Sequence, residues 1–406
     1  MGGLAIDGGR PVRDVSQKPW PAWPIFGEPE KSNLLEVFES GHWFYGKKVK
    51  EFEEKFATFQ GANFGVSCTN GTAALEMALY ACGIKAGDEV IIPPYSFIAT
   101  ASAVLRMNGV PIFADINLET CNLDPEDTER KITERTRAII PVHVGGLPAD
   151  MDAFKLIAQK YRLKLIEDAC HSWGSQWKGK GTGALGDCGA FSFQMSKNIT
   201  SGEGGILLTE QEEIADIARS FSNCGRSKTG QWYQHVLAGT NLRLTELQAA
   251  ILLGQLSRLK EQTEHREKTA RILDEALKNV PGIETIPSDE RVTRRSYHLY
   301  IFRFIGEDWK ISRDRFVELL NAEGIPASAG YPPLYRNPLF QEKSLTAVCS
   351  LSCPRYGRTI NYTNVFCSQA EKASWQTVWL PHWLLLAPVE EMADVVEAIR
   401  KIRAFF

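Results

Sequence analysis

Short apolar runs alternate with amphipathic segments between Gly61 and Arg219. The apolar runs are typical of buried strands, and the segments between them carry apolar residues at helical spacing. The predicted strands are residues 64–67, 89–92, 111–114, 138–141, 163–166 and 205–209, and the predicted helices are residues 72–81, 97–107, 152–160 and 211–221. This alternation predicts an α/β fold with a mostly parallel central sheet covered by helices.

The rest of the chain predicts a second, smaller domain. Residues 241–269 have the pattern of a long helix that leaves the large domain, residues 297–304 alternate like a strand, and residues 313–322 and 388–402 read as helices. Residues 337–370, with mixed polar residues, Pro and Cys, are predicted as loop. Residues 1–30 are rich in Pro and Trp and predict an extended arm, and helical periodicity begins near Ser32 and again over residues 49–59. We therefore expect an arm at 1–30, a large domain at 31–255 and a small α+β domain at 256–406.

Composition limits the classes of partner. The chain has 406 residues, is 44% hydrophobic and carries a formal net charge of −3, without long basic or acidic runs. This argues against nucleic-acid and anionic-membrane binding and favours a small-molecule partner. No signal pattern or membrane-spanning run is apparent, so we expect a cytoplasmic protein. The nine cysteines are scattered and match no zinc spacing, which predicts reduced thiols and no metal.

Lys197 is the first candidate for chemistry. An apolar alternation around Ser192 reads as a strand, and polar residues and a glycine cluster after it predict a sharp turn behind Lys197. Apolar neighbours at a strand end lower the pKa of a lysine, and a neutral amine can form a Schiff base with a carbonyl cofactor. The alternative is a solvated surface lysine, which is the usual state of a lysine considered alone.

The motif around Lys197 resembles a known family. Ser-Phe-Gln-Met-Ser-Lys-Asn-Ile-Thr-Ser-Gly-Glu-Gly-Gly, residues 192–205, looks like the cofactor-lysine motif of the DegT/DnrJ/StrS aminotransferases. These are pyridoxal-phosphate (PLP) enzymes of fold type I that aminate keto-sugars and keto-cyclitols. The resemblance implies that PLP is the cofactor and that Lys197 bonds to it.

Asp168 ends the strand segment that begins at Leu163, and His171 follows three residues later. A carboxylate there can pair with a protonated pyridine nitrogen and keep the cofactor ring an electron sink. The alternative for Asp168 is a structural acid that caps a turn. By resemblance, residues 167–171 match the family's Glu-Asp-Ala-Ala-His, with Cys170 in place of the second alanine. His171 either lies near the ring or is a core histidine with satisfied hydrogen bonds.

A phosphate site is predicted where Asn70-Gly71-Thr72 opens a helix. Free backbone N–H groups and the Thr72 hydroxyl can bind phosphate there, and Ser192 can add a second hydroxyl. The alternative is an ordinary helix cap. By resemblance, Asn241 reaches the phosphate of the partner subunit, which implies a homodimer with shared active sites.

Other assignments depend on the resemblance alone. Phe97 occupies the family's ring-stacking position, and Gln194 stands where many nucleotide-sugar enzymes have His. A glutamine there can hydrogen-bond the phenolic oxygen of the cofactor but cannot transfer protons. Gln194 and the segment with Tyr331 and Tyr335 look like the branch that acts on keto-cyclitols and aminoshikimate-type compounds. Tyr331, Tyr335 and Arg243 are therefore candidates for substrate binding, although the two tyrosines also fit an exposed loop.

Together these features predict a ping-pong transamination. An amino group would move from glutamine or glutamate to a keto-cyclitol or keto-sugar of scyllo-inosose type, with Lys197 as general base and acid. Two alternatives stay open: a dehydrating, aromatising PLP lyase of the aminohydroxybenzoate synthase type, and a non-catalytic regulatory relative.

Overall fold

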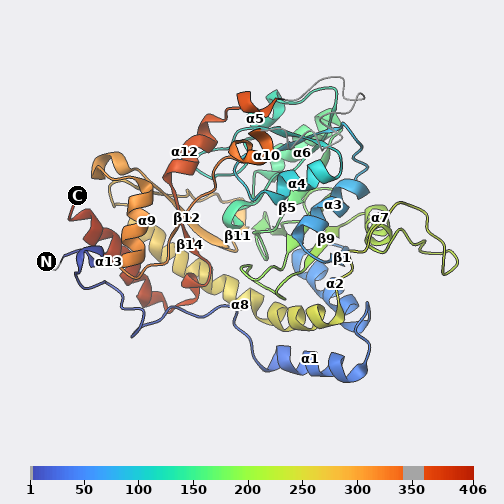
Figure 1. The fold of residues 1–406 in the computed structure, drawn as a ribbon, viewed down its shortest axis with the longest axis horizontal. Helices are drawn as coiled ribbons and strands as arrows, with labels where there is room; N and C mark the ends of the chain where they lie inside the picture. The colour runs from blue at the N-terminus through green and yellow to red at the C-terminus, as the bar shows by residue number, and fades with distance from the viewer. Residues whose placement is uncertain (1–2, 342–360) are drawn as a thin grey trace.

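The computed structural model describes residues 3–341 and 361–406 (Figure 1). The helices are α1 (Glu28–Ser40), α2 (Lys47–Gln60), α3 (Gly71–Ala81), α4 (Ala99–Arg106), α5 (Pro125–Arg130), α6 (Met151–Tyr161), α7 (Glu212–Ser222), α8 (Glu246–Leu277), α9 (Arg313–Ala322), α10 (Pro338–Gln341), α12 (Ser368–Gln376) and α13 (Met392–Arg403). The strands are β1 (Phe64–Cys68), β2 (Glu89–Ile92), β3 (Val110–Phe113), β4 (Thr136–Ile139), β5 (Lys164–Asp168), β6 (Gln176–Trp177), β7 (Lys180–Gly181), β8 (Cys188–Ser192), β9 (Gly205–Thr209), β10 (Ile283–Thr285), β11 (Val292–Arg294), β12 (Leu299–Phe304), β13 (Ser328–Ala329) and β14 (Thr377–Pro381).

A seven-stranded sheet in the order β1-β9-β8-β5-β4-β2-β3 forms the centre of the larger region. The pairs β2/β3, β2/β4, β4/β5 and β5/β8 are parallel, whereas β9 runs antiparallel to both of its neighbours. The strands are almost wholly buried, because helices cover the sheet and leave little of it to solvent. The predicted α/β class with a mostly parallel sheet is confirmed.

Helix α3 begins directly after β1, at the carboxyl end of that strand. Ala, Leu and Met side chains occupy nearly all of its faces and are buried, and the helix packs against β8, α4 and α7. Its first turn is capped by Asn70, whose side-chain oxygen accepts a hydrogen bond from the N–H of Ala73 at 2.9 Å. The N-terminus of α3 is therefore held at the end of β1.

The smaller region is built on a four-stranded antiparallel sheet in the order β10-β12-β14-β13. Its core includes residues of α9, α13 and the C-terminal half of α8, and Figure 1 shows α8 running from one region to the other. The N-terminal arm packs on this same core through Leu4, Val12 and Trp20. Arg13 secures the arm, because its fully buried guanidinium forms ion pairs of 2.7 Å with Glu391 and Asp394.

Most predicted elements are present with boundaries shifted by one or two residues. The predicted helix starts near 32 and at 388 differ by four residues from the observed Glu28 and Met392, and the long helix ends at Leu277, not at 269. Two other starts were wrong for identifiable physical reasons. The long helix begins at Glu246, not 241, because Thr245 and Gln248 form a reciprocal capping box. Strand β12 begins at Leu299, because Tyr297 has a left-handed backbone with φ of 46°.

The loop predicted over residues 337–370 was partly wrong. Residues Pro338–Gln341 form α10, and α12 begins at Ser368, while residues 342–360 lie outside the described part of the chain. Short elements such as α5 and β14 were not predicted. No helix within residues 3–341 and 361–406 is both long and apolar enough to cross a membrane.

The predicted domain boundaries stay a prediction, and the packing is more interleaved than they imply. Four residues that lie between β13 and β14 of the small sheet in sequence belong to the hydrophobic core of the large one: Leu334, Tyr335, Phe340 and Tyr362. The chain after residue 256 thus returns to the larger region before β14 closes the smaller sheet.

Candidate active site

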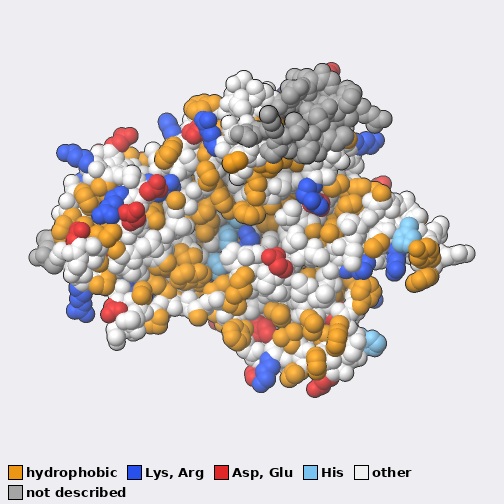
Figure 2. Space-filling model, viewed as in Figure 1, with side chains coloured by type: hydrophobic (Ala, Val, Ile, Leu, Met, Phe, Trp, Pro, Cys, Tyr) orange, Lys and Arg blue, Asp and Glu red, His pale blue; other side chains and the backbone are white. Residues whose placement is uncertain are grey.

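A cavity of about 650 Å³ lies at the carboxyl ends of β1, β2, β5 and β8. This is the edge of a parallel sheet at which ligands bind, and the volume falls in the roughly 300–1,000 Å³ range of small-molecule sites. Figure 2 shows histidine and Lys or Arg side chains together near the middle of the face, between the two regions. Two walls can be distinguished. The sheet wall comprises Asn70–Thr72, Phe97, Asp168–His171 and Ser192–Lys197, and the outer wall comprises Trp23, His298, Tyr331, Trp379 and His382.

Lys197 places its amine in this cavity. The side chain is half-buried, and within the described residues its Nζ has no ion pair or hydrogen-bond partner. Burial lowers the pKa of the Lys197 amine, an effect that nearby Cys170 and Asp168 partly oppose. The Nζ lies 5.7 Å from the centroid of the buried Trp173 ring. Burial therefore makes the neutral, nucleophilic form of the amine more accessible than it is for a solvated lysine.

Asp168 is held rigidly at the end of β5. Its Oδ2 accepts a hydrogen bond of 2.7 Å from the Thr100 hydroxyl, and its Oδ1 accepts one of 3.2 Å from the Cys170 N–H. The residue is only 5% exposed yet lines the cavity. Because no cation forms an ion pair with it among the described residues, a cationic N–H of a ligand would complete its pairing.

The N-terminus of α3 forms the anion-binding corner of the sheet wall. Gly71 and Thr72 are the first helical residues, so their N–H groups have no acceptor within the helix. A Cβ at Gly71 would lie 2.7 Å from the Ser192 Cβ, so only glycine allows this close approach to β8. The backbone N–H groups and the hydroxyls of Thr72 and Ser192 thus lie at one corner of the cavity, as a phosphate requires.

Phe97, Gln194 and His171 also line the cavity. The Phe97 ring is 57% exposed, unlike the buried residues just before it. Gln194 accepts hydrogen bonds of 2.8 Å from the backbone and the hydroxyl of Ser196. His171 is buried, and burial together with the Lys197 charge holds its pKa well below the usual range, so its ring is neutral.

Of the four remaining candidates, only Tyr331 lies at the cavity. Tyr331 lines the cavity, with its ring centroid 4.6 Å from that of Trp379. Tyr335 does not: it is fully buried, and its hydroxyl donates a hydrogen bond of 2.8 Å to Glu371. Asn241 and Arg243 lie outside the cavity on the connection between α7 and α8, where Arg243 donates a hydrogen bond of 2.9 Å to the side chain of Asn223.

Sequence reasoning missed most of the outer wall. Trp23 reaches the cavity from the arm, His298 precedes β12, Trp379 lies in β14, and His382 directly follows β14. These positions are far apart in the sequence and share no spacing, so no local pattern marks them. Thr100, the partner of Asp168, was also missed, although it belongs to a helix that the sequence predicted.

The residues of the sheet wall fit PLP. A half-buried amine, a carboxylate without a cationic partner, an anion-binding helix terminus and an exposed aromatic ring meet in one cavity. These are the groups that a phosphorylated pyridine aldehyde needs. In the described part of the chain, no group of three or more His, Cys, Asp or Glu side chains could hold a metal ion.

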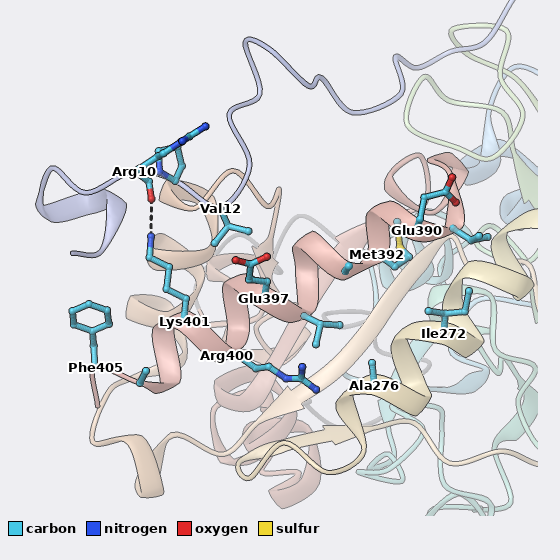
Figure 3. Close-up of a pocket in the computed structure, with 15 residues that line it drawn as sticks. Arg10, Val12, Ile272, Ala276, Glu390, Met392, Glu397, Arg400, Lys401 and Phe405 are labelled. Carbon is cyan, nitrogen blue, oxygen red and sulfur yellow. Dashed lines mark hydrogen bonds between the residues drawn. The ribbon is translucent and has the colours of Figure 1, made fainter. Parts of the chain in front are cut away.

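A more open groove of about 1120 Å³ lies between α8, α13 and the N-terminal arm (Figure 3). Lys401 closes one side of it with a hydrogen bond of 2.7 Å to the backbone oxygen of Arg10. The groove mixes Ile272 and Met392 with charged side chains such as Glu397, and it contains none of the sheet-wall residues. We therefore place the active site in the smaller cavity.

Comparisons with known proteins agree with this site. The model of the DegT/DnrJ/EryC1/StrS aminotransferase family matches residues 24–400. An L-glutamine:2-deoxy-scyllo-inosose aminotransferase of Micromonospora echinospora is 37% identical, covering 99% of this chain and 98% of its own. A 3-amino-5-hydroxybenzoate synthase of Amycolatopsis mediterranei is 36% identical, covering 94% of this chain and 96% of its own.

The fold agrees as well. The crystal structure of a 3-amino-5-hydroxybenzoic acid (AHBA) synthase superposes with a TM-score of 0.85 at 35% identity, over 95% of this chain and 99% of that one. Fold type I, the PLP cofactor and the aminotransferase class predicted from the sequence are thereby confirmed. The chain belongs to the DegT/DnrJ/EryC1/StrS family of PLP-dependent aminotransferases.

Proposed function

We propose that this enzyme transfers an amino group from glutamine or glutamate to a ketone on a hydroxylated ring, a keto-cyclitol of scyllo-inosose type or a keto-sugar. The observation that carries the proposal is the Lys197 amine, half-buried in a cavity whose outer wall presents the Tyr331 hydroxyl and His298. Such polar groups suit a substrate rich in hydroxyls. The similarity to a scyllo-inosose aminotransferase over the full chain supports the same acceptor class.

Five residues around the cavity have a defined task in this proposal: Lys197, Asp168, Thr72, Ser192 and Phe97. PLP, when bound, supplies an electron-withdrawing ring that can hold and return an amino group. Lys197 would hold the cofactor through its Nζ, and its free amine would take up and return a proton at the substrate carbon. Asp168 would pair with a cationic ring N–H, and the α3 N-terminus with Thr72 and Ser192 would bind the phosphate. Phe97 offers its exposed ring for stacking.

The assay that tests this proposal uses purified protein loaded with PLP. Glutamine and a scyllo-inosose ketone should give an amino-cyclitol and the keto acid of the donor, detected by mass spectrometry. Each half-reaction should proceed without the other substrate, as a ping-pong mechanism requires. No amino product with glutamine, glutamate or alanine as donor would refute the proposal.

A PLP lyase that dehydrates and aromatises an aminoshikimate-type substrate is the second candidate. The 3-amino-5-hydroxybenzoate synthase is nearly as similar to this chain as the aminotransferase relative, 36% against 37% identity. The two reactions differ in their products, because only the lyase generates an aromatic ring. Incubation with an aminoshikimate-type substrate and detection of new ultraviolet absorbance distinguishes them.

We also propose a homodimer in which Asn241 serves the partner's active site. Asn241 is exposed and outside the cavity of its own chain. Large apolar side chains are exposed close to Asn241 in sequence, Trp232 (78%) and Tyr233 (76%), and at the cavity, Phe97 (57%). For the cellular location we propose the cytoplasm, because the seven described cysteines are free thiols, as in a reducing compartment.

Mixed subunits test the shared site. Lys197→Ala and Asn241→Ala should each inactivate homodimers, whereas mixed dimers retain one intact site. Statistical mixing then restores up to about a quarter of the wild-type activity. Recovery of no activity, with mixing verified by mass spectrometry, would contradict the shared site.

A further inference from the structure

Three buried histidines line the cavity beside the cofactor lysine. The ring centroids of His171 and His298 are 4.5 Å apart, and those of His298 and His382 are 5.7 Å apart. Trp23 of the arm continues the column with an edge-on contact of 4.4 Å to His382. The three histidines are at most 6% exposed, so each polar ring atom needs a partner or faces the cavity.

The tautomer of His382 follows from its partners. Its Nδ1 accepts a hydrogen bond of 3.2 Å from Arg266, which can only donate. Its Nε2 lies 3.0 Å from the backbone oxygen of Ser196, which can only accept. Burial and the Arg266 charge hold the pKa of His382 well below its ordinary value, so the ring is neutral. The Nε2–H of His382 therefore donates to the backbone of Ser196.

The tautomer of His298 follows in the same way from Asn198. The Asn198 Nδ2 donates a hydrogen bond of 2.9 Å to the backbone oxygen of Ser296, which fixes the orientation of the amide. The Asn198 Oδ1 is then the atom that lies 3.0 Å from the Nδ1 of His298, so this nitrogen carries the proton. Burial and the neighbouring cationic and histidine groups keep the pKa of His298 well below its ordinary value.

Ser196 and Asn198 are the two residues that flank Lys197. The Lys197 N–H donates a hydrogen bond of 2.9 Å to the backbone oxygen of Gln194, while its long side chain has no polar partner among the described residues. The backbone on either side must therefore direct the amine. We propose that His298 and His382 are positioning residues that hold the chain on both sides of Lys197 and so aim its amine at the cofactor. This inference rests on the proposed use of Lys197.

The two histidines come from a different region of the fold than Lys197. Lys197 belongs to the sheet wall, whereas His298 and His382 precede β12 and follow β14 in the smaller region. Trp23 adds a hydrogen bond of 3.1 Å from its Nε1 to the backbone oxygen of Met195, in the same turn. The lysine turn is thus fixed by chain segments outside the sheet that carries it. Displacement of the smaller region would therefore change the position of the Lys197 amine.

Replacing each histidine by Asn or Gln distinguishes the contribution of its hydrogen bond from that of its side-chain packing. The amide nitrogen of Asn lies close to the position of Nδ1 of His, and that of Gln lies close to Nε2. His298→Asn and His382→Gln therefore keep the donor that holds the turn. His298→Gln and His382→Asn displace it while keeping a polar side chain of similar size. For each histidine, the variant that keeps the donor is the control for the variant that displaces it.

The readout is the pH titration of the absorbance band of PLP bonded to Lys197, near about 420 nm. The other titratable or charged groups near Lys197 are Asp168, Cys170 and His171, with Arg266 behind His382. All four are unchanged in every variant, so they influence each titration in the same way. We expect His298→Gln and His382→Asn to shift the midpoint by about one pH unit, and the matched variants by less than half of that. Thermal unfolding of each variant verifies that the fold is retained.

Each outcome decides the inference. Unchanged midpoints in all four variants, or equal shifts within each pair, overturn it, because packing alone would then explain the histidines. If His298→Gln does not fold, Asn198→Ala removes the acceptor instead and must shift the midpoint in the same direction. A wild-type protein without the band refutes the proposed role of Lys197, whereas a normal band with unchanged midpoints refutes only the positioning role.

Discussion

The two walls of the cavity are built in different ways. Every residue of the sheet wall ends or follows a strand of one mostly parallel sheet, as Asp168 ends β5 and Ser192 ends β8. The outer wall gathers single side chains from the arm, from the start of β12, from the segment at Tyr331 and from β14. In the proposed function, the sheet wall binds the cofactor, whereas the outer wall both contacts the substrate through Tyr331 and holds the lysine turn through His298 and His382. Substitutions in the two walls should therefore change different quantities.

The largest effect is expected for Lys197→Ala. Removing the amine abolishes both the bond to PLP and the proton transfers at the reacting carbon, so activity should fall by about 10³-fold or more. The absorbance band that borohydride removes should also be absent. Lys55→Ala, at an exposed lysine paired with Glu51, is the control and should behave as wild type. Retention of the band in Lys197→Ala would show that another amine binds the cofactor.

Asp168→Asn should have the next largest effect. The buried carboxylate, held by Thr100, loses its charge but not its shape, so a cationic ring N–H loses a buried partner worth about 3–5 kcal/mol. We expect kcat to fall by at least about 100-fold. Thr100→Val leaves the charge and removes one hydrogen bond, so it should cost about 10-fold. If Thr100→Val were as severe as Asp168→Asn, orientation and not charge would be the main contribution of this pair.

The same contrast explains which parts of the molecule were predictable. The apolar strands 64–67, 89–92 and 205–209 have clear boundaries, because they are buried on both faces and flanked by turn residues. The sheet-wall residues follow such strands, so local sequence brought Lys197 and Asp168 to one edge.

The outer wall had no equivalent signal. Trp23 and His298 become neighbours of Lys197 only through tertiary packing, which single-sequence periodicity does not encode. Tyr331 and Tyr335 look alike in the sequence, yet one faces the cavity and the other is bonded to Glu371 in the core. The start of α8 was missed because the capping box at Thr245 is stronger than the helical pattern before it.

Acid should destabilise the protein through the histidines. Burial lowers the pKa values of His171, His298 and His382 in the folded protein. As the pH falls below about 6.5, these histidines therefore bind protons in the unfolded chain before they do so in the folded one. The free energy of unfolding should thus be maximal above that pH and decrease below it, by about 1 kcal/mol per histidine for each pH unit.

Urea titrations at pH 7.5 and 5.5 measure this effect. His298→Asn removes one of the three groups and should reduce the difference between the two pH values by about a third. An equal stability of the wild-type protein at both pH values would mean that the buried histidines accept protons in the folded state.

The smallest effect is expected for Tyr331→Phe, which tests the outer wall alone. The Tyr331 hydroxyl has no hydrogen bond within the described residues, and burial and the nearby Asp168 charge raise its pKa, so it remains a donor facing the cavity. Loss of one hydrogen bond to substrate should raise KM for the ketone by up to about 10-fold and leave the PLP spectrum unchanged. Tyr335→Phe is the matched control: it loses the bond to Glu371, so it should lower stability by about 1 kcal/mol without changing KM. A change of KM in Tyr335→Phe, or none in Tyr331→Phe, would mean that the outer wall does not contact the substrate as its position in the cavity implies.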